Sequence, residues 1–365
     1  MSKVYFTDMR TSFTENLPKK LTRLIDRAGL STIDFDHKFV AIKIHFGEMG
    51  NLAYLRPQYA RALAAYIKER GGLPFLTDCN TLYVGSRKNA LEHIETAYIN
   101  GYTPYATGCQ VIIADGVRGT DEAYIPIGCA EVKTAKIGRA IADADIIISL
   151  NHFKGHEDAG FGGALKNLGM GSGSRAGKME MHYDGKPVVD RDRCRGCRKC
   201  ATICANDGIH YENSKAVIDH DNCVGCGRCI AICSFDAIKP HNSSSAASLN
   251  RRIAEYAYAV VKDKPNFHIS IAADISPNCD CHPENDAPIV PNIGMFASFD
   301  PVAIDLAAAD AVNAMPANPR SALSEAECRC HDHFINVHPN TNWRVQIEHG
   351  EEIGLGSSEY ELIRI

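Results

Sequence analysis

The sequence predicts an α/β fold, in which a mainly parallel sheet carries helices on both faces and a small cysteine-rich insert interrupts the chain. Short apolar stretches rich in β-branched residues alternate with helical patterns over the first 150 residues. The alternation resumes after a block that holds eight of the fifteen cysteines. Roughly 150 residues make a typical domain, so a chain of 365 residues has room for two or three units.

Buried-type strands and helices alternate in the first part of the chain. The predicted strands are Phe39–Phe46, Leu73–Leu76, Val111–Ala114 and Asp145–Leu150. The predicted helices are Pro57–Arg70, Arg87–Asn100 and Val132–Ala142. The first helix has a proline near its start and Gly71–Gly72 after its end, both typical of helix boundaries. Such alternation is typical of βαβ units, whose neighbouring strands run parallel.

After the cysteine block the chain returns to this pattern. The expected elements are a helix at Ala246–Lys262, a strand at Phe267–Ala272 and a helix at Pro301–Asn313 capped by Asp300. They are too few for a sheet of their own. We therefore expect one discontinuous α/β domain over residues 1–186 and 242–365, an insert over residues 187–241, and a returning linker at His241–Ala247.

Composition and charge exclude several classes of protein. The chain is 45% apolar and 23% charged, which excludes a disordered chain. A formal net charge of −5 argues against a general nucleic-acid binder. No apolar run reaches the roughly 18 residues that a membrane span needs, and the N-terminal residues lack the apolar core of a secretory signal. We expect a cytoplasmic protein that binds neither nucleic acid nor membrane.

The insert contains an internal repeat. A shift of 29 residues lays the segment Val188–Ile209 on Val217–Ile238, and each cysteine of the first half falls on a cysteine of the second. Two halves of this size make a module too small for a substantial core without staples. Because the reducing cytoplasm discourages disulfides, we expect the staples to be metal clusters.

The cysteine spacing predicts two [4Fe–4S] clusters. Each half reads C-x2-C-x2-C-x3-C, a spacing in which three thiolates bind one cluster and the fourth binds the other. The predicted ligands are Cys194, Cys197, Cys200 and Cys233 for the first cluster, and Cys204, Cys223, Cys226 and Cys229 for the second. Two zinc sites are the alternative, although zinc usually uses separated C-x2-C pairs. The block resembles bacterial-type two-cluster ferredoxins, which shuttle single electrons, but Ala205 and Ser234 replace the proline that usually follows the fourth cysteine.

Polar residues follow the predicted strands, at the edge where open α/β sheets bind ligands. They are His45, Glu48, Asp78, Cys79, Asp115, Asn151, His152, Lys154, His156 and Asp274. The H-x3-H pair His152 and His156, with Lys154 between them, could ligate a metal, transfer protons or hold an anion. The candidate catalytic residues are these three and His45. Ordinary polar loop positions are the alternative for each.

A glycine-rich stretch at Gly160–Lys178 is predicted as a loop that approaches a phosphate or cofactor closely. It is not a P-loop, because Ser172 stands where that motif needs glycine and Met179 stands where it needs serine or threonine. It is not a dinucleotide fingerprint either, because the nearest predicted strand ends too early. The candidate cofactor-binding residues are Lys166, Asn167, Gly171, Gly173 and Arg175. A loop that only packs against the insert is the alternative.

Two C-x-C pairs are candidates for a further metal site. They are Cys279 and Cys281, followed by His282, and Cys328 and Cys330, followed by His331. One pair alone chelates poorly, and nothing in the sequence brings the two together. Buried or incidental thiols are therefore the alternative.

Three segments carry a resemblance to a known family. They are Asn151–Gly171, the cysteine block and Ser276–Asp310. On these segments the chain resembles a family of uncharacterised iron–sulfur-centre proteins, found largely in anaerobic bacteria and archaea. The resemblance implies the architecture and the clusters, but no substrate. The family motifs contain His152, Lys154, His156, Lys166, Asn167, Cys279, Cys281 and Asp300.

Together these observations predict an iron–sulfur redox protein that relays electrons to a substrate or further cofactor in a pocket of the α/β domain. A protein of this kind that acts on a substrate would be an oxidoreductase. The insert leaves the main chain just after the glycine-rich stretch, which brings the clusters close to that pocket. A non-catalytic electron carrier, and a binding or maturation factor for a metal or cofactor, are the alternatives. The expected partners are a redox protein and a small-molecule substrate.

Overall fold

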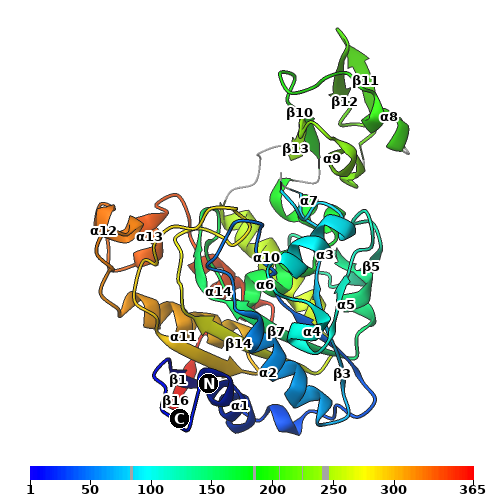
Figure 1. Ribbon diagram of the computed structural model, residues 1–365. Helices are drawn as coiled ribbons and strands as arrows, with labels where there is room; N and C mark the ends of the chain where they lie inside the picture. Colours follow the sequence, from blue (N-terminus) through cyan, green and yellow to red (C-terminus); the bar gives the residue numbers. More distant parts are fainter. Residues whose placement is uncertain (83–84, 184–185, 205, 224, 241–245) are drawn as a thin grey trace.

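The structure is a computed structural model that describes residues 1–82, 85–183, 186–204, 206–223, 225–240 and 246–365. An eight-stranded sheet forms its centre (Figure 1). The strands lie in the order β16 (Tyr360–Arg364), β1 (Ser2–Asp8), β15 (Gly294–Ser298), β14 (Asn266–Ala272), β7 (Ile146–His152), β2 (Phe39–Lys43), β3 (Leu73–Asp78) and β4 (Gln110–Ile113). Within this sheet only β15 is antiparallel to its neighbours. The predicted α/β fold with a mainly parallel sheet is confirmed.

Alternate residues of the central strands feed two apolar clusters, one on each face. In β2, Val40 and Ile42 belong to one cluster and Ala41 to the other. The first face carries α1 (Leu17–Arg27), α2 (Pro57–Lys68) and α3 (Ala90–Ile99). The second carries α6 (Ala164–Ser172), α10 (Ala246–Val261), α11 (Pro301–Asn313) and α14 (Arg344–Glu352) (Figure 1). No helix among the described residues is long and apolar enough to cross a membrane.

Shorter elements complete the main domain. The helices are η1 (Leu30–Thr32), α4 (Pro104–Thr107), α5 (Arg139–Asp143), α7 (Arg175–Tyr183), α12 (Ala322–Glu325) and α13 (His333–Val337). The hairpins pair β5 (Glu122–Pro126) with β6 (Thr134–Gly138), and β8 (Lys154–His156) with β9 (Gly160–Gly162). The hairpin β8–β9 follows β7 directly and carries two of the candidate catalytic residues.

Most predicted elements are confirmed, but the helix predicted at Val132–Ala142 is wrong. Strand β6 occupies the middle of that segment, and only the short α5 follows it. The reason is the alternation of burial along the segment. Ala135 and Ile137 are buried, whereas Thr134 and Lys136, which precede them in turn, are half-buried. A period of two suits a strand, and β5 supplies the partner.

The glycine-rich stretch forms helices α6 and α7, so its prediction as a loop is wrong. Its glycines permit close packing instead. A Cβ at Gly169 would lie 2.2 Å from the carbonyl oxygen of Ile253 on α10, and a Cβ at Gly163 would lie 2.2 Å from Asp305 on α11. Asp305 accepts hydrogen bonds from the first two N–H groups of α6, at 2.6 and 2.8 Å. The glycines therefore set the position of α6.

The insert consists of two strand pairs and two short helices. They are β10 (Pro187–Val189) with β13 (Ile238–Pro240), β11 (Ile209–Glu212) with β12 (Lys215–Ile218), α8 (Lys199–Ile203) and α9 (Arg228–Ile232). Within the described ranges these strands pair only with one another. Figure 1 shows the insert beside α7. Residues 241–245 of the predicted returning linker lie outside the described residues.

Candidate functional site

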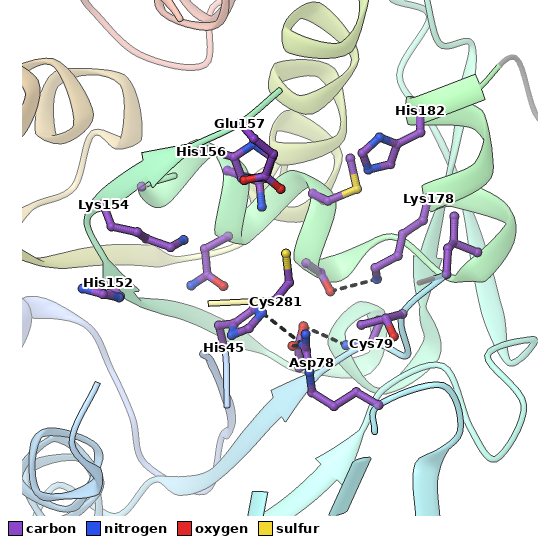
Figure 2. A pocket seen from close by; sticks show the side chains of 18 residues that line it. His45, Asp78, Cys79, His152, Lys154, His156, Glu157, Lys178, His182 and Cys281 are labelled. Carbon is purple, nitrogen blue, oxygen red and sulfur yellow. Dashed lines mark hydrogen bonds and ion pairs between the residues drawn. The ribbon is translucent and has the colours of Figure 1, made fainter. Parts of the chain in front are cut away.

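A cavity of about 70 Å³ lies at the carboxyl ends of β2, β3 and β7 (Figure 2). The residues that follow these strands form one wall, and the hairpin β8–β9, helices α6 and α7 and the loop after β14 form the others. The polar side chains that line it are His45, Asp78, Cys79, Thr81, Arg87, His152, Lys154, His156, Glu157, Lys166, Asn167, Lys178, His182 and Cys281. This is the sheet edge that the strand-end residues predicted.

All four candidate catalytic residues line this cavity, but they differ in what their side chains can do. Hydrogen bonds engage both ring nitrogens of His152, since Nδ1 lies 2.8 Å from Asp280 and Nε2 lies 2.8 Å from the carbonyl oxygen of Ala273. That gives His152 a positioning role. Burial and the nearby Arg87 lower the pKa of His45 to about 3, so its imidazole is neutral.

The ring of His156 hydrogen-bonds the backbone on one side and the Cys279 thiol on the other. Its Nδ1 accepts hydrogen bonds from the backbone N–H groups of Asp158 and Ala159, at 3.0 and 3.1 Å. The proton of the neutral ring is then on Nε2, which lies 3.8 Å from Glu157. His156 is therefore a hydrogen-bond donor at the cavity wall.

The candidate cofactor-binding residues divide into two groups. Lys166, Asn167 and Gly171 line the cavity, whereas Gly173 and Arg175 do not. Asn167 is committed to the fold, since its Oδ1 accepts from Lys43 at 2.6 Å and its Nδ2 donates to backbone and side-chain oxygens. Arg175 packs against the insert instead.

The cavity is rich in positive charge. Lys154, Lys166 and Lys178 line it, together with Arg87. Lys154 is only 5% exposed, yet its ammonium has no hydrogen bond or ion pair with any residue that the structure describes. Several cations gathered in one cavity repel one another, so an anionic ligand would be stabilised among them.

One of the two acidic residues that line the cavity, Asp78, is already neutralised. Asp78 forms an ion pair with the fully buried Lys43 at 3.0 Å. Burial opposes ionisation of Asp78, but the charge of Lys43 outweighs it and holds the pKa of this carboxyl well below its usual range. Asp78 therefore does not offset the charge of the three lining lysines.

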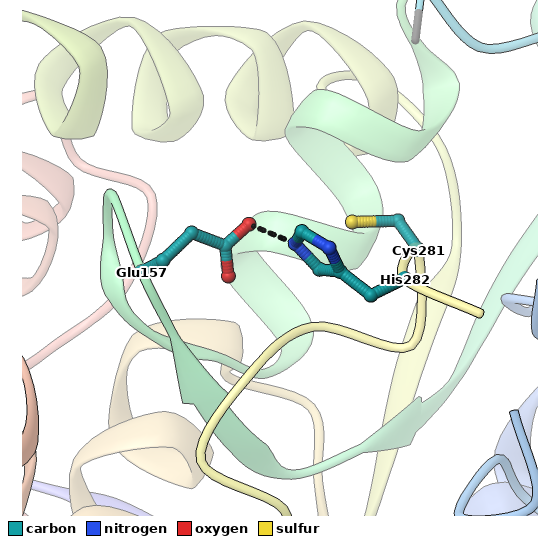
Figure 3. A group of neighbouring side chains, drawn as sticks. All are labelled: Glu157, Cys281 and His282. Carbon is teal, nitrogen blue, oxygen red and sulfur yellow. Dashed lines mark hydrogen bonds and ion pairs between the residues drawn. The ribbon is translucent and has the colours of Figure 1, made fainter. Parts of the chain in front are cut away.

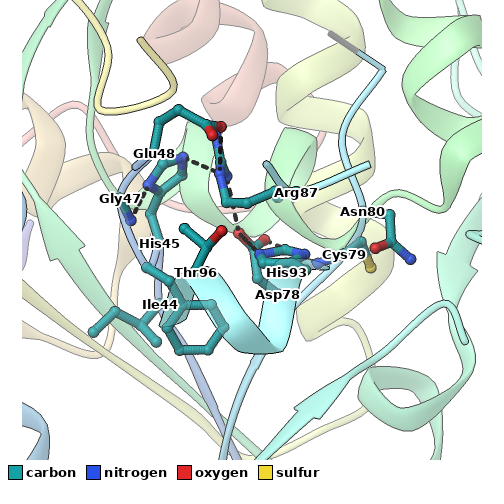
Figure 4. Close-up of polar contacts among 12 residues, drawn as sticks. Ile44, His45, Gly47, Glu48, Asp78, Cys79, Asn80, Arg87, His93 and Thr96 are labelled. Carbon is teal, nitrogen blue, oxygen red and sulfur yellow. Dashed lines mark hydrogen bonds and ion pairs between the residues drawn. The ribbon is translucent and has the colours of Figure 1, made fainter. Parts of the chain in front are cut away.

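A second ion-pair network supports the wall (Figure 4). Arg87 is 1% exposed; its Nε donates to Glu48 at 2.9 Å, and its Nη1 lies 3.0 Å from His45 and 3.8 Å from Asp78. Glu48 accepts a further hydrogen bond from the N–H of Ser86 at 2.6 Å. This network fixes the loops after β2 and β3 relative to each other.

One C-x-C pair belongs to the cavity and the other does not. Cys281 lines the cavity, and Cys279 accepts a hydrogen bond from Lys166 at 3.5 Å. A hydrogen bond from Cys281 and the charges of Lys154 and Lys166 outweigh burial and lower the pKa of the Cys279 thiol. Cys328 and Cys330 are exposed, and no cluster of potential ligands among the described residues joins them to the first pair.

Each predicted set of cluster cysteines surrounds one small cavity of the insert, of about 20 Å³ in each case. One is lined by Cys194, Cys197, Cys200 and Cys233, the other by Cys204, Cys223, Cys226 and Cys229. Backbone N–H groups of Ala216 and Ala237 donate to the sulfurs of Cys194 and Cys233, at 3.4 and 3.3 Å. The described residues that line these cavities include no histidine or carboxylate, so the donor sets suit a thiolate-bound metal.

The insert lies directly beside the central cavity. Its apolar cluster contains Cys194, Cys200 and Cys229 together with Leu82 and Met179 of the α/β domain. Leu82 also lines the central cavity. A second cavity, of about 350 Å³, separates the insert from the loop around Cys281 and shares Leu82, Glu157 and Cys281 with the first. An ion pair of 2.6 Å between Lys88 and Asp236 closes one side.

The sequence did not predict several residues of the site. Lys43 is a charged residue inside an otherwise apolar strand, which is a signal in itself because lysine is almost never fully buried without a partner. Glu157 follows His156 directly, but its role depends on a loop more than a hundred residues away. Arg87 lies near the start of a predicted helix, where no pattern marks it.

Comparisons with known proteins give a family and distant similarities of fold. No curated protein matches the chain. A protein of known crystal structure from Thermotoga maritima is 12% identical with a TM-score of 0.40, over 80% of this chain and 56% of that one. The lactate racemase apoprotein from Thermoanaerobacterium thermosaccharolyticum is 10% identical with a TM-score of 0.37, over 75% of this chain and 51% of that one. The chain thus spans about half the length of both structures.

The family model of a domain of unknown function, DUF362, matches residues 40–310. This range includes the central strands, the hairpin β8–β9, the insert and α11. The chain belongs to the DUF362 family.

Proposed function

We propose that this protein is an iron–sulfur redox protein that holds two [4Fe–4S] clusters in its insert and relays electrons to an anionic small molecule in the central cavity. The observation that carries the proposal is the gathering of eight cysteines around two cavities, four to each. Each set combines three cysteines of one repeat with one of the other. Clusters bound in this way supply single electrons.

The surroundings of the cysteines support clusters in preference to zinc. Glycines at 196 and 227 adopt left-handed backbone angles, with φ of +66° and +65°, where the chain turns around the thiolates. Backbone N–H groups point at two of the sulfurs, as is usual around iron–sulfur clusters. Zinc sites would leave these triplets of closely spaced cysteines unexplained.

The position of the insert supports electron transfer to the central cavity. Leu82 belongs to the same apolar cluster as Cys229 and also lines the cavity, so the cluster and the cavity share this residue. Met179 on α7 belongs to the same cluster. The second set of cysteines is therefore connected to the cavity wall through packed apolar side chains.

The charge of the cavity supports an anionic ligand. Lys154 can hold a carboxylate or phosphate oxygen, and Lys166 and Lys178 add to the positive potential. Lys154 is buried, and the lower dielectric constant around it strengthens its attraction for an anion.

Cluster content tests the first part of the proposal. Anaerobically isolated protein is expected to contain about eight iron and eight sulfide per chain, with an EPR signal after dithionite. Cys233→Ser and Cys204→Ser should each lose about half of both, because each removes one ligand from one cluster. The control Cys328→Ser, outside the insert and exposed, should lose none. Colourless, EPR-silent protein that contains zinc without sulfide would contradict the proposal.

Ligand retention tests the second part. Mass spectrometry of small molecules released from the anaerobic protein is expected to find an anion, and Lys154→Met should reduce its retention at least tenfold. Lys239→Met is the control, because Lys239 lines the second cavity and not the first. Equal retention by both variants, or retention of a neutral molecule, argues against an anion held by Lys154.

A further inference from the structure

Two loops bring three different metal-binding groups together between the two cavities (Figure 3). Glu157 lies in the turn between β8 and β9, and Cys281 and His282 lie in the loop after β14. A carboxylate oxygen, a thiol sulfur and a ring nitrogen of these residues all lie within 4.8 Å of one another. Neither the cluster cysteines nor the anion-binding lysines belong to this group.

Glu157 holds the loop in place. One of its oxygens lies 2.9 Å from Nε2 of His282, and the other accepts the backbone N–H of Cys279 at 3.3 Å. The side chains of His282 and Glu157 are 37% and 32% exposed, so an ion can reach them. The three groups are thus positioned before any ion arrives, which lowers the entropic cost of binding.

The donor set indicates the kind of ion. A thiolate, an imidazole and a carboxylate together suit zinc or iron(II), whereas calcium and magnesium prefer oxygen alone. Sites with three protein ligands generally keep a position open for water or substrate. Glu157 and Cys281 line both cavities, so the open position would face a space that a ligand can occupy.

We propose that Glu157, Cys281 and His282 bind one divalent transition-metal ion, zinc or iron(II), separate from the two clusters. The site lies at the junction of the two cavities, where the ion can coordinate an oxygen of the anionic molecule held by Lys154. This assignment goes beyond the redox function. Binding of the ion uses none of the cluster cysteines, and only its contact with the anionic molecule rests on the proposed function.

The chain provides a matched control. The sequence C-x-C-H occurs twice, at Cys279–His282 and at Cys328–His331. The second copy has exposed cysteines, and no carboxylate forms a metal-binding group with it among the described residues. The same four-residue pattern therefore occurs once with a neighbouring carboxylate, that of Glu157, and once without one.

Zinc content and zinc X-ray absorption test the proposal on the full-length, cluster-loaded protein. Wild type dialysed against zinc is expected to retain about one zinc per chain, with one sulfur at about 2.3 Å and nitrogen or oxygen at about 2.0 Å. Glu157→Gln and His282→Ala should each weaken zinc retention at least tenfold, and His331→Ala should not. Iron and sulfide content is measured in each variant, so that loss of the clusters is distinguished from loss of this site.

Two results would overturn the assignment. One is wild-type protein with full clusters and no retained zinc. The other is zinc bound by sulfur alone, or retained equally by His282→Ala and His331→Ala. Because the absorption spectrum is measured on wild type, the conclusion does not depend on the variants folding.

Discussion

Gly227 is the residue whose replacement tests how the insert is held against the central cavity. Its φ is +65°, and a Cβ at this position would lie 2.7 Å from Cγ of Arg175 on α7. The internal repeat supplies its counterpart, because Arg198 occupies the equivalent position with φ of +66° and an exposed side chain. A left-handed backbone alone does not demand glycine there. The close approach of Arg175 does.

The expected effect is the sum of two contributions. A non-glycine residue in the left-handed region costs about 1–2 kcal/mol. Overpacking against Arg175 adds about 1–3 kcal/mol. Gly227→Ala should therefore reduce the free energy of opening of the insert by about 2–5 kcal/mol. Arg198→Gly relieves the backbone cost without any change at Arg175, and should increase that free energy by about 1–2 kcal/mol, less the loss of the guanidinium contact with the Tyr211 ring.

Native-state proteolysis of the anaerobic full-length protein provides the assay, because cleavage of a transiently open segment tracks its free energy of opening. Iron content is measured in parallel, so that loss of metal is not mistaken for opening. The decrease in the free energy of opening caused by Gly227→Ala is compared with the increase caused by Arg198→Gly. If the decrease is no larger than the increase, Arg175 makes no tight contact with residue 227, and the reasoning is refuted.

Two further substitutions test the main domain by thermal denaturation followed by circular dichroism. Arg87→Met leaves Glu48 without its buried partner and should destabilise the fold by about 3–5 kcal/mol. Arg329→Met, which removes an exposed ion pair, should cost at most about 1 kcal/mol, and equal effects would show that burial does not matter here. Gly169→Ala should cost about 1–3 kcal/mol, because its Cβ forces α6 away from Ile253 despite the better helix propensity of alanine. An unchanged melting temperature for Gly169→Ala would contradict that packing.

The central sheet was predictable because its signals are local. Strand β7 begins with three consecutive isoleucines, and α11 starts with a capping aspartate and a proline, so each can be recognised without its neighbours. The segment Val132–Ala142 shows the limit. Its apolar spacing fits both periods, and the choice depended on β5, a partner strand that the sequence analysis did not identify. The glycine-rich stretch failed for a related reason, since its glycines serve contacts with α10 and α11 that only the folded chain defines.

The candidate site was predictable in part. The rule that ligands bind at the carboxyl ends of parallel strands found His45, His152 and Lys154 at one cavity. It could not find Glu157 with His282, because their pairing joins segments 125 residues apart in the chain. Nor could it show that the ring nitrogens of His152 are already engaged, which depends on Asp280 and on the backbone of the adjacent strand end.

The apolar centre of the insert has a practical consequence for anyone preparing this protein. Three of its nine fully buried members are cysteines, so much of what would be hydrocarbon in an ordinary small domain is sulfur here. With clusters bound, removing iron would empty the middle of the insert while the eight-stranded sheet kept its own two apolar layers. Cells grown with too little iron should therefore yield two populations, one complete and one with a collapsed insert, which a mild protease would separate by trimming the second.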